Sequence, residues 1–316
     1  MFKICMTDYQ FATPDLEYQW FTQSGIEFVA AQCQNTEQLL SLAKDADGII
    51  SSYFKISADI IQQLPKLKCI SSLGVGVDHI DLTAAKAASV MVANVPDAYT
   101  EEVATTALAM ALSLIRHLPF LHDSVKQGHW DYLKTGCMQR PSEMTLGIAG
   151  FGKIGRSFAK LAQPCFGNVI AFDPFLADEH WPPDVPQMTS LLALVEQADV
   201  LSLHMPINAD NYHLLGRELL AAMKPGSYVI NVARGELIDS QALTQALDCG
   251  HLAGAALDVL EHEPPLKNDQ LVVHPRVLVN PHASFYSTAS EREARYKAAH
   301  NLITWVKTGQ PNYRVV

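Results

Sequence analysis

The glycine-rich segment Gly150–Gly155, which reads Gly-Phe-Gly-Lys-Ile-Gly, constrains the fold of this chain more than any other feature because of the segments around it. The apolar run 144–149 leads into it, a helix-compatible stretch follows over 153–162, and a second apolar run covers 169–172. Short apolar runs bounded by glycines are typical of buried strands. The order therefore predicts a strand, a tight turn, a helix and a second strand, which together form a βαβ unit.

Each of the three glycines is required in such a unit for a different physical reason. Gly150 allows the tight turn, Gly152 lets the backbone approach a pyrophosphate, and Gly155 lets the helix pack closely on the strand. The pyrophosphate would lie at the helix N-terminus, and Asp173, at the end of the second strand, can accept hydrogen bonds from ribose hydroxyls. An ordinary βαβ turn without a ligand is the alternative. We expect a dinucleotide to contact Gly150, Gly152, Lys153, Ile154, Gly155 and Asp173.

The carboxylate of Asp173 also indicates which dinucleotide is bound. A carboxylate at this position repels the 2′-phosphate of NADP, and no Arg or Lys lies between Asp173 and Met188 to bind that phosphate. NAD is therefore the expected cofactor.

Length and charge exclude several classes of protein. The 316 residues suffice for two domains, and 48% hydrophobic with 18% charged residues is the composition of a globular protein. The net charge of −10 disfavours nucleic acid and anionic membranes as partners. The longest apolar-leaning run, 103–115, is too short to span a bilayer. The six cysteines form no CxxC pair, which favours reduced thiols and a cytoplasmic location; they are Cys5, Cys33, Cys69, Cys137, Cys165 and Cys249.

Strand and helix patterns alternate along two blocks of the chain, which predicts two α/β lobes with parallel sheets. In the first block, strands are expected at 2–6, 26–30, 48–52, 68–73 and 90–93, with helices at 36–44 and 57–63. In the second, further strands are expected at 199–205, 227–233, 254–260 and 277–280, with helices at 239–249 and 290–307. Between the blocks, a helix over 100–117 is apolar on nearly every face, and 118–142 shows little periodicity. We interpret this irregular segment as a dimerisation arm.

Three segments end strands with unusual polar residues: Asn231–Gly235, Leu257–Pro264 and Asn280–Ser284. In an open α/β sheet, ligands bind at the carboxyl ends of the strands, so these segments are expected to converge beside the nicotinamide. The combination suits hydride transfer to a 2-oxo acid.

Three side chains in these segments have the required chemistry. Arg234 binds carboxylate and carbonyl oxygens, and His282 gives a proton to the carbonyl oxygen as hydride arrives. Glu263 holds one tautomer of that histidine and favours the imidazolium. The run Glu261–Glu263 superficially resembles metal ligands, but adjacent residues seldom face one ion, so no metal is expected.

These motifs resemble the D-isomer-specific 2-hydroxyacid dehydrogenases, and the resemblance covers nearly the whole chain. It implies that Arg234, Glu263 and His282 form the catalytic set, and that a flavodoxin-like substrate domain, 1–97 plus 287–316, contains an inserted Rossmann domain, 98–286. The loop 73–79 resembles the family's substrate loop, whose N–H groups correspond to Val75 and Gly76. The implied cofactor contacts further include Asp258, His204, Met205, Pro206, Val232, Ala233, Arg234 and His282.

Within the family, the segments 7–12 and 281–287 look most like the subgroup related to C-terminal-binding-protein corepressors. Phe285 stands where that subgroup usually has Trp, and His79 stands where Asn is commoner. Ser52 and Tyr53, at the end of an early strand, are expected substrate contacts.

The sequence therefore predicts a cytoplasmic, homodimeric, NAD-dependent enzyme that interconverts a small 2-oxo acid and a D-2-hydroxy acid. Two alternatives stay open. One is a corepressor-like protein that senses the dinucleotide, and the other is an NADP-linked glyoxylate or hydroxypyruvate reductase.

Overall fold

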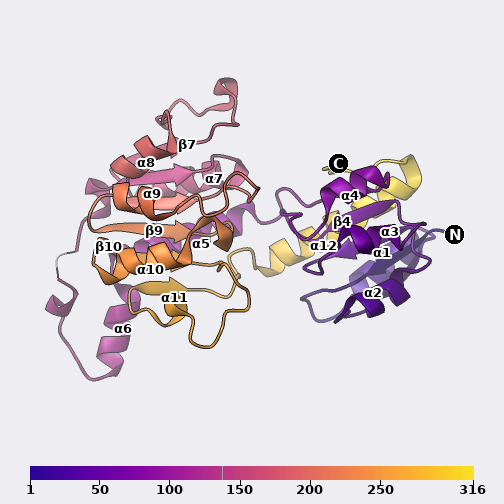
Figure 1. The fold of residues 1–316 in the computed structure, drawn as a ribbon, viewed down its shortest axis with the longest axis horizontal. Coiled ribbons are helices and arrows are strands. Elements are labelled where there is room, and N and C mark those ends of the chain that lie inside the picture. The colour runs from indigo at the N-terminus through magenta and orange to yellow at the C-terminus, as the bar shows by residue number, and fades with distance from the viewer. Residues whose placement is uncertain (137) are drawn as a thin grey trace. The chain divides into compact units, whose positions relative to one another are not determined.

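The computed structural model describes residues 1–136 and 138–316, so Cys137 lies outside the described residues. The chain divides into two compact units (Figure 1): unit 1 contains Met1–Tyr99 and Tyr286–Val316, and unit 2 contains Thr100–Phe285. These junctions differ by one or two residues from the ends expected for the domains 1–97 plus 287–316 and 98–286.

Unit 1 is built on a five-stranded parallel sheet in the order β2-β1-β3-β4-β5, which is the flavodoxin-like order. Its strands are β1 (Lys3–Met6), β2 (Glu27–Ala30), β3 (Gly48–Ser51), β4 (Cys69–Ser72) and β5 (Met91–Ala93). Its helices are α1 (Asp15–Gln23), α2 (Thr36–Ala43), α3 (Ala58–Gln62), α4 (Leu82–Ala87) and α12 (Thr288–Thr308).

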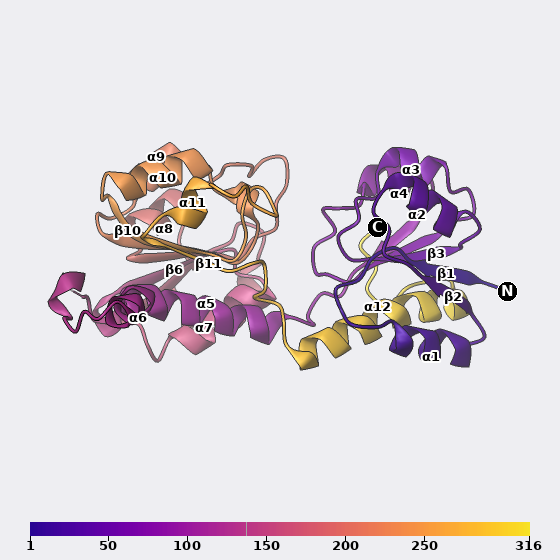
Figure 2. The ribbon, with the colours of Figure 1, turned by 90° about the horizontal axis from the view of Figure 1, so that it is seen from below.

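Alternating side chains of these strands fill a separate apolar core on each face of the unit 1 sheet. Ile4 and Met6 of β1 pack in one core with Leu302 of α12, whereas Cys5 packs in the other core with Leu39 of α2. Because successive strand residues point to opposite faces, a strand with both faces covered reads as a continuous apolar run. Figure 2 shows α1 and α12 on one face and α2, α3 and α4 on the other.

Unit 2 is built on a six-stranded parallel sheet in the order β11-β10-β9-β8-β6-β7. Its strands are β6 (Thr145–Ala149), β7 (Asn168–Phe172), β8 (Val200–Leu203), β9 (Ser227–Asn231), β10 (Leu252–Leu257) and β11 (Val277–Val279). The direction of strand progression reverses between β6 and β8. In doubly wound sheets a ligand binds at the carboxyl ends of the strands at such a switch point.

Helices cover both faces of the unit 2 sheet, with α5 and α7 on one face and α8 to α11 on the other (Figure 2). They are α5 (Thr100–Ile115), α6 (Leu118–Lys126), α7 (Lys153–Ala162), α8 (Leu191–Gln197), α9 (Arg217–Ala222), α10 (Ser240–Asp248) and α11 (Gln270–Val273). The two parallel sheets with helices on both faces confirm the predicted α/β class.

Every strand expected from the sequence is present, with ends that differ by up to three residues. The expected runs 227–233 and 254–260 extend past β9 and β10 because Val232, Val259 and Leu260 are buried in the loops that follow. The expectation of an irregular segment over 118–142 was wrong for α6, which begins after His117 with a positive φ of 50°. Pro119 lies in its first turn, where a missing N–H costs nothing.

No single helix in the described part of the chain is long and apolar enough to cross a membrane. Taken together, α5 and α6 are long and apolar enough in length and composition, but they are bent by 60° relative to each other.

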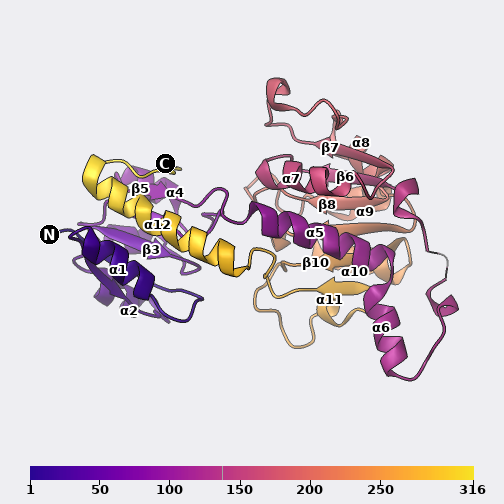
Figure 3. The same cartoon turned by 180° about the vertical axis from the view of Figure 1, so that it is seen from behind.

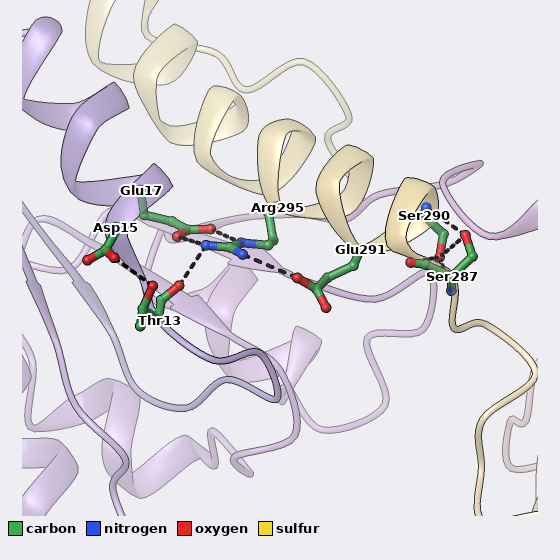
Figure 4. A network of polar contacts seen from close by, with 7 residues as sticks. All are labelled: Thr13, Asp15, Glu17, Ser287, Ser290, Glu291 and Arg295. Carbon is green, nitrogen blue, oxygen red and sulfur yellow. Dashed lines mark hydrogen bonds and ion pairs between the residues drawn. The ribbon is translucent and has the colours of Figure 1, made fainter.

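A buried ion pair connects the two chain segments of unit 1, which are far apart in sequence. Arg295 of α12 donates to both carboxylate oxygens of Glu17 of α1, at 2.8 and 2.7 Å, and to the carbonyl oxygen of Thr13 at 2.8 Å (Figure 4). The guanidinium also lies 3.7 Å from the ring centroid of Phe11 and 3.2 Å from a carboxylate oxygen of Glu291. Seen from behind, α12 runs alongside α1 (Figure 3), so this pair fixes the C-terminal helix to the N-terminal one.

We predict that Arg295→Met destabilises unit 1 by about 3–5 kcal/mol, because the Glu17 charge would stay buried without its partner. The double variant Glu17→Leu/Arg295→Met should recover much of this loss, because no buried charge remains. Urea unfolding followed by tryptophan fluorescence measures both effects. Lys66→Met is the control, since the Lys66–Asp45 pair has 60% of each side chain exposed and water screens it, so its loss should shift stability little. An equal shift in Arg295→Met and Lys66→Met would contradict the prediction.

Candidate active site

The residues predicted for the site in unit 2 all follow the carboxyl ends of its parallel strands. The glycine loop joins β6 to α7, Asp173 follows β7, and His204–Pro206 follows β8. Val232, Ala233 and Arg234 follow β9, Asp258 follows β10 and His282 follows β11. One edge of one sheet therefore carries the predicted cofactor and catalytic groups.

The geometry of the glycine loop gives each glycine a separate role. At Gly150, which has a φ of +90°, a Cβ would lie 2.7 Å from the carbonyl carbon of His204. At Gly155, a Cβ would lie 2.3 Å from the carbonyl oxygen of Gly150, so only glycine permits this close packing of α7 on the loop. At Gly152, a Cβ would meet nothing within 4 Å. The backbone of Gly152 therefore borders open space at the N-terminus of α7, where a pyrophosphate fits.

Asp173 connects the glycine loop to the end of β7. Its Oδ2 accepts a hydrogen bond from the N–H of Phe151 at 2.7 Å, and its Oδ1 accepts one from the N–H of Phe175 at 2.9 Å. A carboxylate accepts about four hydrogen bonds, so lone pairs remain for ribose hydroxyls. Phe151 is fully buried and packs on Trp181 with ring centroids 4.8 Å apart, which fixes the loop from its other side.

His204 contributes a neutral imidazole beneath the glycine loop. Burial lowers the pKa of His204 to about 3. Its Nε2 lies 2.8 Å from Oγ of Ser202, and its buried Nδ1 has no hydrogen-bond partner among the described residues. The open backbone at Gly152, the ribose-type acceptor Asp173 and this unmatched polar atom together fit a dinucleotide.

The turn that carries Arg234 is fixed by two residues that the predicted site set lacked. The side chain of the fully buried Asn231 accepts from the N–H of Ala233 at 3.0 Å and donates to the carbonyl oxygen of Arg234 at 2.8 Å. At Gly235, a Cβ would lie 2.0 Å from the carbonyl carbon of Leu260. An amide side chain ending a buried strand, followed by glycine, is the sequence signal for both roles. The Arg234 turn thus packs directly on the loop that leads to Glu263.

Asp258 fixes the turn that carries His282. Its carboxylate, 2% exposed, accepts from the N–H of Ala283 at 2.9 Å and from the N–H of Ser284 at 3.1 and 3.0 Å. The N–H of His282 donates to the carbonyl oxygen of Asp258 at 2.8 Å. These bonds hold His282 at a positive φ of 51°, a conformation that is strained for a residue with a Cβ.

Glu263 and His282 form a hydrogen-bonded pair, with 2.6 Å between Oε2 and Nδ1. The other oxygen, Oε1, accepts from the N–H of Leu260 at 2.8 Å. Partial burial acts to raise the pKa of Glu263, but the bond to His282, the Leu260 N–H and the charge of Arg234 outweigh it, so this pKa is lowered. The carboxylate therefore stays ionised at neutral pH and is lost only as pH falls through the lowered value.

The predicted substrate residues of unit 1 also follow strand ends. Ser52 and Tyr53 come after β3, and Val75 and Gly76 come after the neighbouring β4. The carbonyl oxygen of Val75 accepts from Nδ2 of Asn94 at 2.7 Å, and that of Gly76 accepts from Oγ of Ser72 at 3.1 Å.

Residues 108–284 match the family described as "D-isomer specific 2-hydroxyacid dehydrogenase, NAD binding domain". The chain belongs to this family, as the sequence motifs predicted, and it carries the family's nicotinamide-dinucleotide-binding domain.

Relatives and solved structures agree with this membership. The chain is 37% identical to the D-3-phosphoglycerate dehydrogenase of Methanocaldococcus jannaschii over 84% of its length and 50% of that protein. It is 33% identical to the glyoxylate reductase of Thermofilum pendens, over 87% of this chain and 83% of that one. The structure of D-2-hydroxyisocaproate dehydrogenase aligns over 99% of both chains with a TM-score of 0.86 and 28% identity. The chain spans about half the length of the first curated relatives that it matches.

We predict that His282→Ala lowers turnover by about 10²–10⁴-fold, because the expected proton donor would be lost, whereas NADH should still bind through the glycine loop and Asp173. Steady-state kinetics and the quenching of intrinsic fluorescence by NADH measure the two effects. His262→Ala is a matched control in the same unit, since His262 is exposed in the loop just before Glu263. Near-normal turnover in His282→Ala would remove this residue from the mechanism.

Proposed function

We propose that this protein is an NAD-dependent dehydrogenase that interconverts a small 2-oxo acid and the corresponding D-2-hydroxy acid. The observation that carries the proposal is the 2.6 Å pair of Glu263 and His282, whose loop packs against the Arg234–Gly235 turn. An acid/base pair beside a fixed cation, on the sheet edge that carries the dinucleotide-binding loop, suits the reduction of a carbonyl next to a carboxylate.

Different residues of the chain have different roles in the proposed reaction. Nδ1 of His282 is bonded to Glu263, so Nε2 is the ring nitrogen that gives the proton to the substrate's carbonyl oxygen. Arg234 binds that oxygen and the substrate carboxylate, and stabilises the charge that develops during reduction. The dinucleotide, when bound, supplies the hydride. In the reverse direction His282 takes the proton from the hydroxyl group.

The backbone N–H groups of Val75 and Gly76 are proposed to bind the substrate carboxylate, and Ser52 and Tyr53 to contact its side chain. Support comes from their positions after adjacent strands and from the hydrogen bonds that fix the β4 loop. Glyoxylate, hydroxypyruvate, pyruvate, 2-oxobutyrate and phenylpyruvate are the substrates to compare, because they share the oxo-acid group and differ in side-chain size.

NAD rather than NADP is the proposed cofactor because the Asp173 carboxylate would repel a 2′-phosphate. We predict NADH-dependent turnover of at least one of these oxo acids, measured as the loss of nicotinamide absorbance. Asp173→Ser should lower the ratio of kcat/KM for NADH to that for NADPH by about tenfold or more, which corresponds to about 1.4 kcal/mol.

Asp178→Ala, on the exposed segment after Asp173, should leave that cofactor ratio unchanged. An unchanged ratio in Asp173→Ser would reject its role in cofactor choice. If NADH binds tightly and no oxo acid is turned over, the dinucleotide-sensing alternative replaces the enzymatic one. A wild-type preference for NADPH would favour the NADP-linked reductase.

A cytoplasmic homodimer is the further proposal, with residues 118–133 as the contact arm. Six large apolar side chains in this segment are 46–90% exposed: Leu118, Phe120, Val125, Trp130, Tyr132 and Leu133. Apolar side chains that gather in one segment are typical of interaction sites. The cysteines among the described residues are all free thiols, which agrees with a reducing compartment.

We predict that the wild-type chain sediments as a dimer and that Phe120→Asp/Val125→Asp weakens the dimer by at least about tenfold, because charges would enter an apolar interface. Analytical ultracentrifugation over a concentration series measures this. Leu192→Asp, at a side chain of α8 that is 48% exposed, is the control for a surface charge elsewhere. Equal dissociation constants for all three proteins would show that α6 is not the contact.

A further inference from the structure

Asp8 is a buried carboxylate that the proposed chemistry does not use. It follows β1 by two residues, is 7% exposed and accepts five hydrogen bonds. Its Oδ1 accepts from Oγ1 of Thr7 at 2.8 Å, Oγ of Ser51 at 3.1 Å and the N–H of Ser52 at 3.1 Å. Its Oδ2 accepts from the N–H of Tyr53 at 2.6 Å and the N–H of Phe54 at 3.2 Å.

Backbone and hydroxyl groups, rather than a cation, compensate this buried charge. None of the ion pairs among the described residues involves Asp8. A buried carboxylate is costly unless hydrogen bonds satisfy it, and bonds to an ionised acceptor are about twice as strong as neutral ones. Three successive N–H groups must therefore point at one carboxylate, which leaves the backbone of 52–54 little freedom.

The loop bound by Asp8 is the one that carries the proposed contacts to the substrate side chain. Oγ of Ser51 also lies 3.2 Å from the carbonyl oxygen of Phe54, so its one hydroxyl hydrogen is shared between this oxygen and Asp8. The side chain of Tyr53 is 50% exposed although its N–H makes the shortest of the five bonds to Asp8. The carboxylate thus fixes the backbone of Tyr53, whose side chain is half exposed.

We propose that Asp8 is a positioning residue that sets the size selection of the enzyme for the 2-oxo acid side chain, by holding Tyr53 in place. This inference rests on the proposed function. In Asp8→Asn, an amide NH₂ replaces one of the two acceptor oxygens and faces donors. At least one N–H of the loop then loses its acceptor, and the loop shifts.

The decisive quantity is the ratio of kcat/KM for glyoxylate to kcat/KM for phenylpyruvate. Both values scale with the amount of folded enzyme, so their ratio does not respond to a loss of stability alone. We expect Asp8→Asn to change the ratio about tenfold, toward one, because a loosened pocket discriminates less by size. The affinity for NADH should stay unchanged, since the fingerprint that binds it belongs to unit 2.

The matched control is Asp47→Asn. Asp47 directly precedes β3, at the end of that strand opposite to the 52–54 loop. Oδ2 of Asp47 accepts from the N–H of Lys3, the first residue of β1, at 2.8 Å. This variant replaces a charged acceptor of a backbone N–H in unit 1 by a neutral one without touching the 52–54 loop, so its ratio should equal that of the wild type. Tyr53→Ala, which removes a half-exposed side chain, should shift the ratio in the same direction as Asp8→Asn. It tests the inference even if Asp8→Asn does not fold.

A wild-type ratio in Asp8→Asn, or in Tyr53→Ala, would overturn the inference. If the wild-type protein turns over none of the oxo acids, the proposed function is rejected. Hydrogen exchange then tests whether Asp8 positions the loop. The amides of 52–54 should exchange faster in Asp8→Asn than in Asp47→Asn. Equal protection in the two variants would overturn the positioning role itself.

Discussion

The arrangement of this protein depends on carboxylates that follow parallel strands and accept N–H groups from the loop after a neighbouring strand. Asp8 after β1 holds the loop after β3, and Asp258 after β10 holds the turn after β11. Asp173 after β7 holds the glycine loop after β6. In each case a carboxylate just after one strand fixes the backbone of the loop that follows the neighbouring strand.

This interaction suits a site in which the side chains must stay available. Backbone N–H donors lose little side-chain entropy when they bind, and a charged acceptor makes the bonds strong. The loop backbone is therefore held by these bonds without using the side chains of residues such as Tyr53 and His282. At His282 the same bonds also maintain a positive φ, which costs on the order of 1–3 kcal/mol and persists only because Asp258 and its neighbours impose it.

The sequence predicted the strands, the α/β class and the positions of Arg234, Glu263 and His282 at strand ends, because apolar runs and glycines act locally. It did not predict α6, whose short helix begins at a left-handed His117 that no periodicity reveals. Nor did it indicate the role of Asp8, since its partners after β3 are chosen by strand order and register. Asp8 and Tyr53 are distant in the sequence and meet only because β1 pairs with β3 in the sheet.

In the proposed mechanism, the residues for proton transfer and those for substrate selection are held by different contacts. Gly235 packs on the backbone of Leu260, and Glu263 bonds to the Leu260 N–H, so Arg234 and the Glu263–His282 pair belong to one packed block of unit 2. A change in that block would disturb proton transfer and cation placement together. The loop held by Asp8 belongs to unit 1 and shares none of these bonds. In the proposed mechanism, side-chain selection and proton transfer therefore depend on separate sets of contacts, one in unit 1 and one in unit 2.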